Sequence, residues 1–267
     1  MPPAERKKNV LVVGGGPGGL ETAVTAARRG HNVTIWDKHE ELGGLIALAE
    51  KPPRKAEFNE ITKYYKNCVN QLNIAVKLGI EANKELIMDF KPDVVVLAIG
   101  GEFIRPSIEG IDQSNVYMAS DVLTNNMNLG KKVVVIGGGQ TGVEVADYLA
   151  EKGISVTIIK RSSGIAGDMP HAVKVPLMLN LQDYGVRILT NTKVKEIKAN
   201  GILVIRKGIE EFIEADSFVI AVGMKAQNNL ETGLKAFVQE LYTVGDCSKP
   251  GKIMDAVHDG YELGLSI

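Results

Sequence analysis

Two glycine clusters in this sequence have the spacing of loops that hold phosphate groups. The pattern Gly-x-Gly-x-x-Gly occurs over residues 14–19 and again over residues 137–142. Between a strand and a helix, the first glycine makes a tight turn, the second lets the backbone approach a pyrophosphate, and the third lets the helix pack on the strand. The anion then lies at the helix N-terminus, where free N–H groups and the helix dipole favour it. Each cluster is therefore a candidate dinucleotide site.

The residues expected to contact the adenosine ribose differ between the two clusters. That contact follows the second strand, about 20 residues after the glycines. After the first cluster it is Asp37, whose carboxylate would accept from a ribose 2′-hydroxyl and repel a 2′-phosphate. After the second cluster it is Lys160, followed by Arg161, and neither side chain can accept a hydrogen bond. These two cations form either a pocket for the 2′-phosphate of NADP(H) or a solvated strand end.

The two clusters belong to a longer internal repeat. A constant shift of 123 residues carries Gly14 to Gly137 and also Glu21 to Glu144. The same shift relates the tripeptide Val-Thr-Ile at 33–35 to its copy at 156–158, and Ala-x-Gly at 98–100 to its copy at 221–223. One offset that links sites so far apart indicates two versions of one module.

Each module is predicted to be a β-α-β unit with a later closing strand. Short apolar runs predict buried parallel strands at 8–13, 32–36 and 93–99 in the first copy, and at 132–136, 155–159 and 216–222 in the second. Helical spacing predicts helices at 17–29 and 141–152, which end at Gly30 and Gly153. The fold class is therefore α/β, with two doubly wound Rossmann-like parallel-sheet domains.

The C-terminal part does not fit the second copy. Residues 241–247 predict one more strand and residues 255–263 one more helix. They either end the second domain or return to complete the first sheet. The linker-like stretches 100–106 and 227–233 favour the return. We therefore predict a first domain of residues 1–105 and 237–267, with a second domain of residues 106–236 inserted into it.

Composition narrows the class of protein. The chain has 267 residues, and 31 basic against 32 acidic residues give a net charge of −1, so nothing favours a nucleic-acid or anionic-membrane partner. Two cysteines cannot form a four-cysteine zinc site or an iron–sulfur cluster, and we expect no metal site. Neither a signal peptide nor a membrane-spanning segment is recognisable. We expect a cytoplasmic protein.

Several motifs together resemble the two-dinucleotide-binding-domain flavoproteins. They are Gly14-Gly-Gly-Pro-Gly-Gly-Leu, Gly43-Gly44, Ala98-Ile-Gly100, Gly137-Gly-Gly-Gln-Thr-Gly and Gly245-Asp-Cys. The wider pattern, with Pro52-Pro-Arg-Lys, Lys252-Ile-Met-Asp-Ala and His258-Asp-Gly-Tyr, is similar to one branch of them. That branch is the C-terminal FAD/NAD(P) reductase half of the old-yellow-enzyme-like NADH:flavin oxidoreductases, the group of 2,4-dienoyl-CoA reductase and trimethylamine dehydrogenase.

The resemblance implies two sets of cofactor-binding residues. FAD would be held by Gly14, Gly16, Pro17, Gly18, Gly19, Asp37, Lys38, Gly43, Gly44, Leu45, Ala82, Ala98, Ile99, Gly100, Gly245, Asp246, Ala256 and Val257. NAD(P) would be held by Gly137, Gly139, Gln140, Thr141, Gly142, Lys160, Arg161 and Gly223. Asp246 would accept from a ribityl hydroxyl, unless it is a turn cap, and the Ala256 and Val257 N–H groups would donate to the flavin O2. Many relatives carry an acidic residue at position 160, so Lys160 favours NADPH over NADH.

The implied activity is FAD-dependent oxidation of NAD(P)H, with electrons passed to a partner. No Cys-x-x-Cys is present, so no redox disulfide is expected, and Cys247 is predicted to pack as a small buried residue. Glu144 either approaches the nicotinamide or is an exposed helical glutamate. In this family an N-terminal barrel with FMN and an iron–sulfur cluster carries the substrate site. The alternatives are a nucleotide-binding remnant with an ADP-like ligand and no redox flavin, and a stand-alone NAD(P)H oxidase.

Overall fold

The computed structural model describes residues 1–125, 127–227 and 229–267, which form two compact units. The first unit comprises residues 1–50, 57–102 and 224–267, and the second comprises residues 51–56 and 103–223. The second unit is inserted into the first, as predicted. The chain returns at Met224 rather than at 237, because β14 (Met224–Ala226) forms a two-stranded sheet with β5 (Gly101–Phe103) where the chain leaves the first unit. Asn228, in the predicted return linker, lies outside the described residues.

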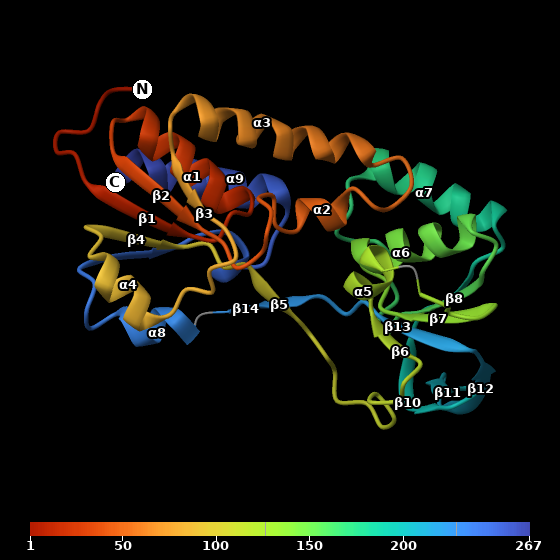
Figure 1. The fold of residues 1–267 in the computed structure, drawn as a ribbon. Coiled ribbons are helices and arrows are strands. Elements are labelled where there is room, and N and C mark those ends of the chain that lie inside the picture. The colour runs from red at the N-terminus through yellow and green to blue at the C-terminus, as the bar shows by residue number, and fades with distance from the viewer. Residues whose placement is uncertain (126, 228) are drawn as a thin grey trace. The chain divides into compact units, whose positions relative to one another are not determined.

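The first unit is built on a five-stranded parallel sheet in the order β15-β4-β1-β2-β3 (Figure 1). Its strands are β1 (Asn9–Val13), β2 (Asn32–Trp36), β3 (Ala75–Lys77), β4 (Val94–Leu97) and β15 (Glu240–Thr243). The pairing of β15 with β4 puts Leu241 opposite Val95. The C-terminal part therefore completes the first sheet, which confirms the predicted return.

Helices cover both faces of this sheet, so its central strands β1 and β4 are largely buried and apolar (Figure 1). α1 (Pro17–Arg28), α3 (Asn59–Gln71) and α9 (Ile253–Ser266) cover one face, and α4 (Lys84–Phe90) and α8 (Asn229–Leu234) the other. The shorter helical segments are the α-helix α2 (Ile46–Ala49) and the 3₁₀-helices η1 (Ala56–Phe58) and η2 (Gly245–Cys247). Val10 and Val12 of β1 pack with the first group of helices, whereas Leu11 packs with the second. Gly264 lets α9 approach α1, because a Cβ there would lie 2.6 Å from the Thr25 Cβ.

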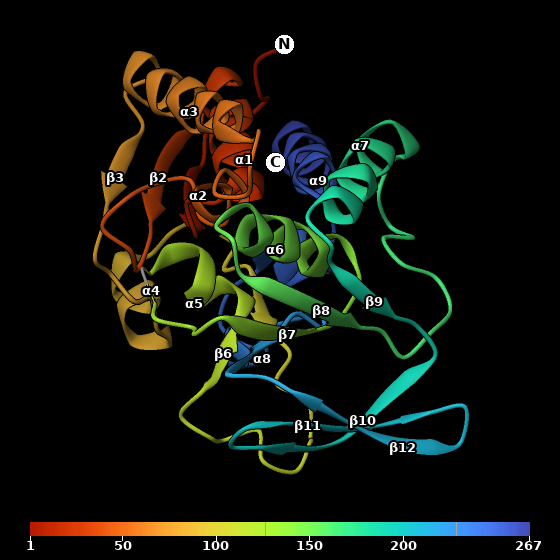
Figure 2. The ribbon, with the colours of Figure 1, turned by 90° about the vertical axis from the view of Figure 1, so that its right-hand side faces the viewer.

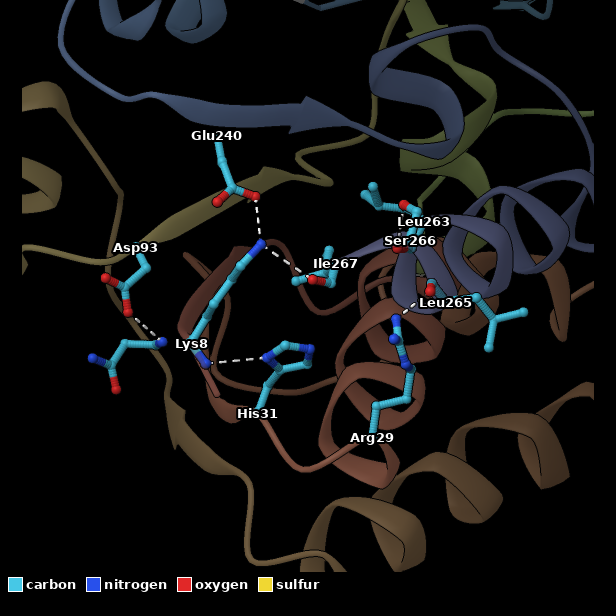
Figure 3. Close-up of polar contacts among 10 residues, drawn as sticks. Lys8, Arg29, His31, Asp93, Glu240, Leu263, Leu265, Ser266 and Ile267 are labelled. Atoms are coloured by element: carbon cyan, nitrogen blue, oxygen red, sulfur yellow. Dashed lines mark hydrogen bonds and ion pairs between the residues drawn. The ribbon is translucent and has the colours of Figure 1, made fainter. Parts of the chain in front are cut away.

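Polar contacts tie both ends of the described chain to the N-terminal edge of this sheet (Figure 3). The Lys8 ammonium donates to the Glu240 carboxylate at 2.8 Å and to the Ile267 carbonyl at 3.2 Å. The Lys8 backbone N–H donates to His31 Nδ1 at 3.2 Å. His31 is buried, and burial lowers its pKa. This contact joins the residue before β1 to the turn after α1.

The second unit repeats the architecture with one additional layer (Figure 2). Its parallel sheet runs β6-β13-β7-β8-β9. These strands are β6 (Val116–Met118), β7 (Lys132–Ile136), β8 (Ser155–Ile159), β9 (Arg187–Leu189) and β13 (Ser217–Ile220). The helices of this unit are α5 (Ala119–Thr124), α6 (Gln140–Glu151) and α7 (His171–Asp183).

A three-stranded antiparallel sheet forms the additional layer and was not predicted. It consists of β10 (Thr192–Lys198), β11 (Gly201–Arg206) and β12 (Ile209–Glu214). Ile197, Ile202 and Ile213 of this sheet pack with Val134 and Phe218 of the parallel sheet. The available sequence signal was the apolar run at 202–205 before the Lys207-Gly208 turn, with Phe212 and Ile213 after it.

The internal repeat is visible in the element bounds. The shift of 123 residues holds up to the buried pair Ile46 and Met169, but α3 and α7, and likewise β3 and β9, are related by 112. The first copy is therefore longer by 11 residues before α3. This stretch includes residues 51–56, which pack in the second unit. In the described part of the chain, the helices are too short or too polar to cross a membrane.

Candidate functional site

In the first unit, the three motif glycines have different steric surroundings. A Cβ at Gly14, where φ is 112°, would collide with the Ala98 carbonyl at the end of β4. A Cβ at Gly19 would collide with the Gly14 carbonyl, so this glycine lets α1 pack against the turn. Around Gly16, no described atom beyond its chain neighbours lies within 4 Å of an added Cβ. Gly16 therefore leaves open space at the N-terminus of α1, as a bound pyrophosphate requires.

Asp37 follows β2 and fixes the glycine loop. Its side chain is buried, its Oδ2 accepts from the Gly15 N–H at 2.6 Å, and its Oδ1 accepts from the His39 N–H at 2.8 Å. The Ile80 N–H donates to the Asp37 carbonyl at 2.9 Å, which brings Ala82 to the same end of the sheet. A carboxylate has about four acceptor positions, so a ribose hydroxyl can share those that remain.

The Gly43-Gly44 loop lies directly against the first glycine cluster. The Gly43 N–H donates to the Gly15 carbonyl at 2.8 Å, and a Cβ at Gly44 would lie 3.0 Å from the Gly16 Cα. Both glycines have positive φ, 121° and 53°. The structure thus brings the two predicted phosphate-contacting loops together. Among the other predicted residues here, Pro17 begins α1, and Lys38 and Leu45 are exposed.

The C-terminal part adds Gly245, Asp246 and Ala256 to this site. Added Cβ atoms at Gly18 and Gly245 would each lie within 4 Å of Ala256. Asp246 is half-buried and accepts from the Gly251 N–H at 2.8 Å, so it does hold a turn, and burial raises its pKa. Because α9 begins at Ile253 rather than at 255, the Ala256 N–H donates to the Lys252 carbonyl. The role predicted for that N–H is thus filled within the helix.

The second unit reproduces the turn around its own glycines. Gly137 has φ 123°, and a Cβ there would collide with the Ala221 carbonyl; a Cβ at Gly142 would collide with the Gly137 carbonyl. Gln140 and Thr141 begin α6, and Gly223 follows β13 with φ 106°. Near Gly139, however, the carboxylate of Asp168 lies 3.4 Å from the position of an added Cβ. The two copies differ at this second glycine.

Lys160 and Arg161 occupy the end of β8. The backbone of Lys160 is fixed on both sides, because its N–H donates to the Leu189 carbonyl at 2.8 Å and its carbonyl accepts from the Thr192 N–H at 3.0 Å. A Cβ at Gly138 would lie 3.2 Å from the Lys160 Cβ, so the side chain starts beside the glycine loop. Arg161 is exposed. The structure thus places the start of the Lys160 side chain beside the second glycine loop, with Arg161 next to it in the chain.

Two buried carboxylates of α6 pair with residues that sequence analysis did not single out. Glu144 is 8% exposed, so the expectation of an exposed helical glutamate is wrong, and it forms an ion pair with Lys55. One turn further on, Asp147 Oδ2 accepts from Arg54 at 2.6 Å, and burial raises the pKa of Asp147. Both cations come from the segment 51–56. Their only sequence signal was the Pro-Pro-Arg-Lys run in the resemblance.

The two cysteines lie on opposite faces of the first sheet. Cys68 is buried among the residues of α1 and α3, and Cys247 packs with Leu11 on the other face. Both are free thiols. Cys247 donates to the Gln227 carbonyl, and burial raises its pKa to about 11. The sheet between them prevents a disulfide in the folded protein. The prediction of a small buried Cys247 is confirmed.

Fold and glycine geometry define a protein with two dinucleotide-binding domains, one inserted into the other. Residues 8–260 match the family described as pyridine nucleotide-disulphide oxidoreductase. The chain belongs to this family of oxidoreductases. It lacks the redox disulfide of the family's name, because the two cysteines are held apart.

Relatives narrow the branch within the family. The chain is 38% identical over 267 residues to an NADH oxidase of Thermoanaerobacter brockii. The match covers 98% of this chain and 41% of that protein. It is 35% identical to a bilirubin reductase of Mediterraneibacter gnavus, again with 41% of that protein covered. The solved structure of a 2-naphthoyl-CoA reductase superposes with a TM-score of 0.95 at 38% identity, covering the whole of this chain and 41% of the other. These matches confirm the resemblance to the reductase half of old-yellow-enzyme-like flavoproteins. The chain spans about two-fifths of the length of these relatives.

Proposed function

We propose that the first unit binds FAD, that the second binds NAD(P)H, and that the chain transfers reducing equivalents from the nicotinamide to the flavin and on to a partner. The observation that carries the proposal is the open backbone at Gly16, at the N-terminus of α1 and beside the Gly43-Gly44 loop. Two glycine-lined helix N-termini in one chain match two dinucleotides.

The residues present fit an FAD. The Gly14–Gly19 turn and Gly44 would hold the pyrophosphate, Asp37 the adenosine ribose, and Asp246 a ribityl hydroxyl. Helix N-termini leave their first N–H groups unpaired, so we assign the donors for the flavin O2 to the first turn of α9, residues 253–255, in place of Ala256 and Val257. When bound, the flavin accepts the hydride, and no acid, base or nucleophile of the protein has to take part.

In the second unit, the residues favour NADPH over NADH. Lys160 and Arg161 are donors at the position where NADH-specific sites have an acceptor. A charge-assisted hydrogen bond contributes about 1.5–3 kcal/mol, and solvent exposure of Arg161 argues for the lower end. Glu144, held by Lys55, is the proposed contact for the nicotinamide side of this nucleotide.

The acceptor of the electrons is proposed from the relatives. Because the chain covers 41% of the NADH oxidase and of the 2-naphthoyl-CoA reductase, those proteins contain additional domains. We propose that the acceptor is a barrel domain or protein with FMN and an iron–sulfur cluster. Direct reduction of dioxygen is a second candidate, which the name NADH oxidase favours.

The test is the absorbance spectrum of the purified chain. We expect one non-covalent FAD per chain, bound either as purified or after incubation with excess FAD. Asp246→Ala should weaken flavin retention more than Cys247→Ala, because only the first removes a group that faces the proposed ribityl chain. A protein that gains no flavin absorbance with excess FAD, but binds ADP, would instead be a nucleotide-binding remnant.

A further inference from the structure

The anion position at the N-terminus of α6 is filled by the protein itself. Both carboxylate oxygens of Asp168 lie 3.1 Å from the Gln140 N–H, the first donor of the helix. The Oδ2 atom is also 3.4 Å from where a Cβ of Gly139 would stand. In the first unit, the equivalent space at Gly16 is open. A bound dinucleotide places its pyrophosphate at this end of the helix.

The loop that carries Asp168 is fixed against the glycine cluster. The Ala166 N–H donates to the Gly138 carbonyl at 2.8 Å, and Ala166 is fully buried. The shift of 123 residues relates this bond to the one between Gly43 and Gly15 in the first unit. The loop of Asp168 is therefore the counterpart of the proposed FAD phosphate loop, and Asp168 stands at the position of Leu45.

We propose that Asp168 is a built-in competitor for the pyrophosphate of the pyridine nucleotide. In the free protein its carboxylate satisfies the first N–H of α6 and is stabilised by the helix dipole. A dinucleotide needs the same N–H, and its phosphate charge repels the carboxylate, so the side chain has to turn away before the nucleotide binds. Asp168 is exposed and can rotate into solvent. This residue would lower the affinity of the second unit for the nucleotide, so a higher nucleotide concentration would be needed to fill the site. The proposal rests on nucleotide binding by the second unit.

Asp168→Asn separates charge from capping. The amide oxygen can still accept from the Gln140 N–H, so the loop and α6 should remain folded. The matched control is Asp183→Asn, which removes the same charge from an exposed position at the end of α7. The probe is ADP-ribose, which has the pyrophosphate and no redox group, and calorimetry measures its Kd.

We expect Asp168→Asn to lower the Kd for ADP-ribose by about tenfold at low salt, the size of one charge-assisted contact, and by less at high salt, where charges are screened. Asp183→Asn should leave the Kd unchanged, and adenosine, without phosphates, should bind the wild type and the Asp168 variant equally. Equal ADP-ribose affinities for wild type and Asp168→Asn, or weaker binding by the variant, would overturn the role of Asp168 alone. Absence of ADP-ribose binding by every form would overturn the nucleotide site as well.

Discussion

Asp37 and Lys160 stand at equivalent places after the second strand of their modules, and their charges predict opposite ribose chemistry. Asp37 is buried and holds Gly15, which makes it part of the turn as well as a candidate ribose acceptor. Lys160 has its backbone fixed by β9 and by the start of β10. We therefore expect Lys160 to contribute most to the proposed choice of cofactor by the second unit.

Lys160→Glu should reverse the preference for NADPH. The carboxylate supplies an acceptor for a 2′-hydroxyl and repels a 2′-phosphate, so we expect kcat/KM for NADPH to fall about tenfold or more and that for NADH to rise. Stopped-flow flavin reduction at low salt is the measurement, because the charge effect is largest there. Lys207→Glu, in the exposed turn between β11 and β12, is the control. If the wild type uses NADH as well as NADPH, the assignment is wrong.

The ion pairs that Glu144 and Asp147 form with Lys55 and Arg54 could not be predicted from the sequence, for a physical reason. Helical spacing shows that the two carboxylates lie one turn apart, but their burial depends on a segment about 90 positions earlier in the chain. Nothing local to α6 indicates that residues 51–56 pack there. By contrast, the roles of Gly14 and Gly19 follow from sequence alone, because a turn and a helix contact leave no room for a Cβ.

At the scale of elements, apolar runs predicted the strands well because both faces of each parallel sheet are covered. β2, β7 and β8 begin and end at the predicted residues. The short edge strands β3, β6 and β9 were missed because three residues are too few to show a strand pattern. The antiparallel layer was missed although β11 contains an apolar run. The early start of α9 depends on Asp255, whose carboxylate accepts from the Lys252 N–H at 2.8 Å.

Because of His31, the free energy of unfolding should fall in acid, through loss of the contact at the N-terminal end of β1. Its Nδ1 accepts from Lys8 N–H, and burial together with Arg29 and Lys8 lowers its pKa below 6.5, against an opposing effect of Glu240. The folded state thus binds fewer protons than the unfolded state, so stability that is present above pH 6.5 is lost as the pH falls from 6.5 through the lowered pKa of His31 in the folded state. Urea unfolding at several pH values measures this loss.

His31→Asn should reduce that dependence on pH, because the amide oxygen can accept from Lys8 N–H and does not titrate. The control is His258→Asn, which replaces an exposed histidine of α9 and should leave the pH dependence of the wild type unchanged. If the free energy of unfolding of the His31 variant depends on acid pH as it does in the wild type, other groups cause the loss of stability.

At the scale of the whole molecule, the repeat indicates one dinucleotide module used twice and modified in three places. The first copy has the additional stretch before α3 that holds the carboxylates of α6, and the second has the antiparallel layer. The return of β15 and α9 adds a second helix N-terminus to the first unit. Both glycine loops retain their turn geometry. The two proposed dinucleotides would occupy both loops.

We therefore expect this chain alone to oxidise NAD(P)H with artificial electron acceptors and to reduce no enoate or enoyl-CoA. The relatives named for reduction of an enoate and of an aromatic acyl-CoA, a cinnamate reductase and a 2-naphthoyl-CoA reductase, extend well beyond the part that this chain covers. The assay supplies FAD and NADPH, follows ferricyanide reduction, and measures cinnamate and crotonyl-CoA consumption and oxygen uptake in parallel. Asp37→Ala, which should lose FAD, is the control for flavin-dependent turnover. Reduction of either unsaturated substrate without an added partner would contradict the expectation, and oxygen uptake as fast as ferricyanide reduction would favour the oxidase.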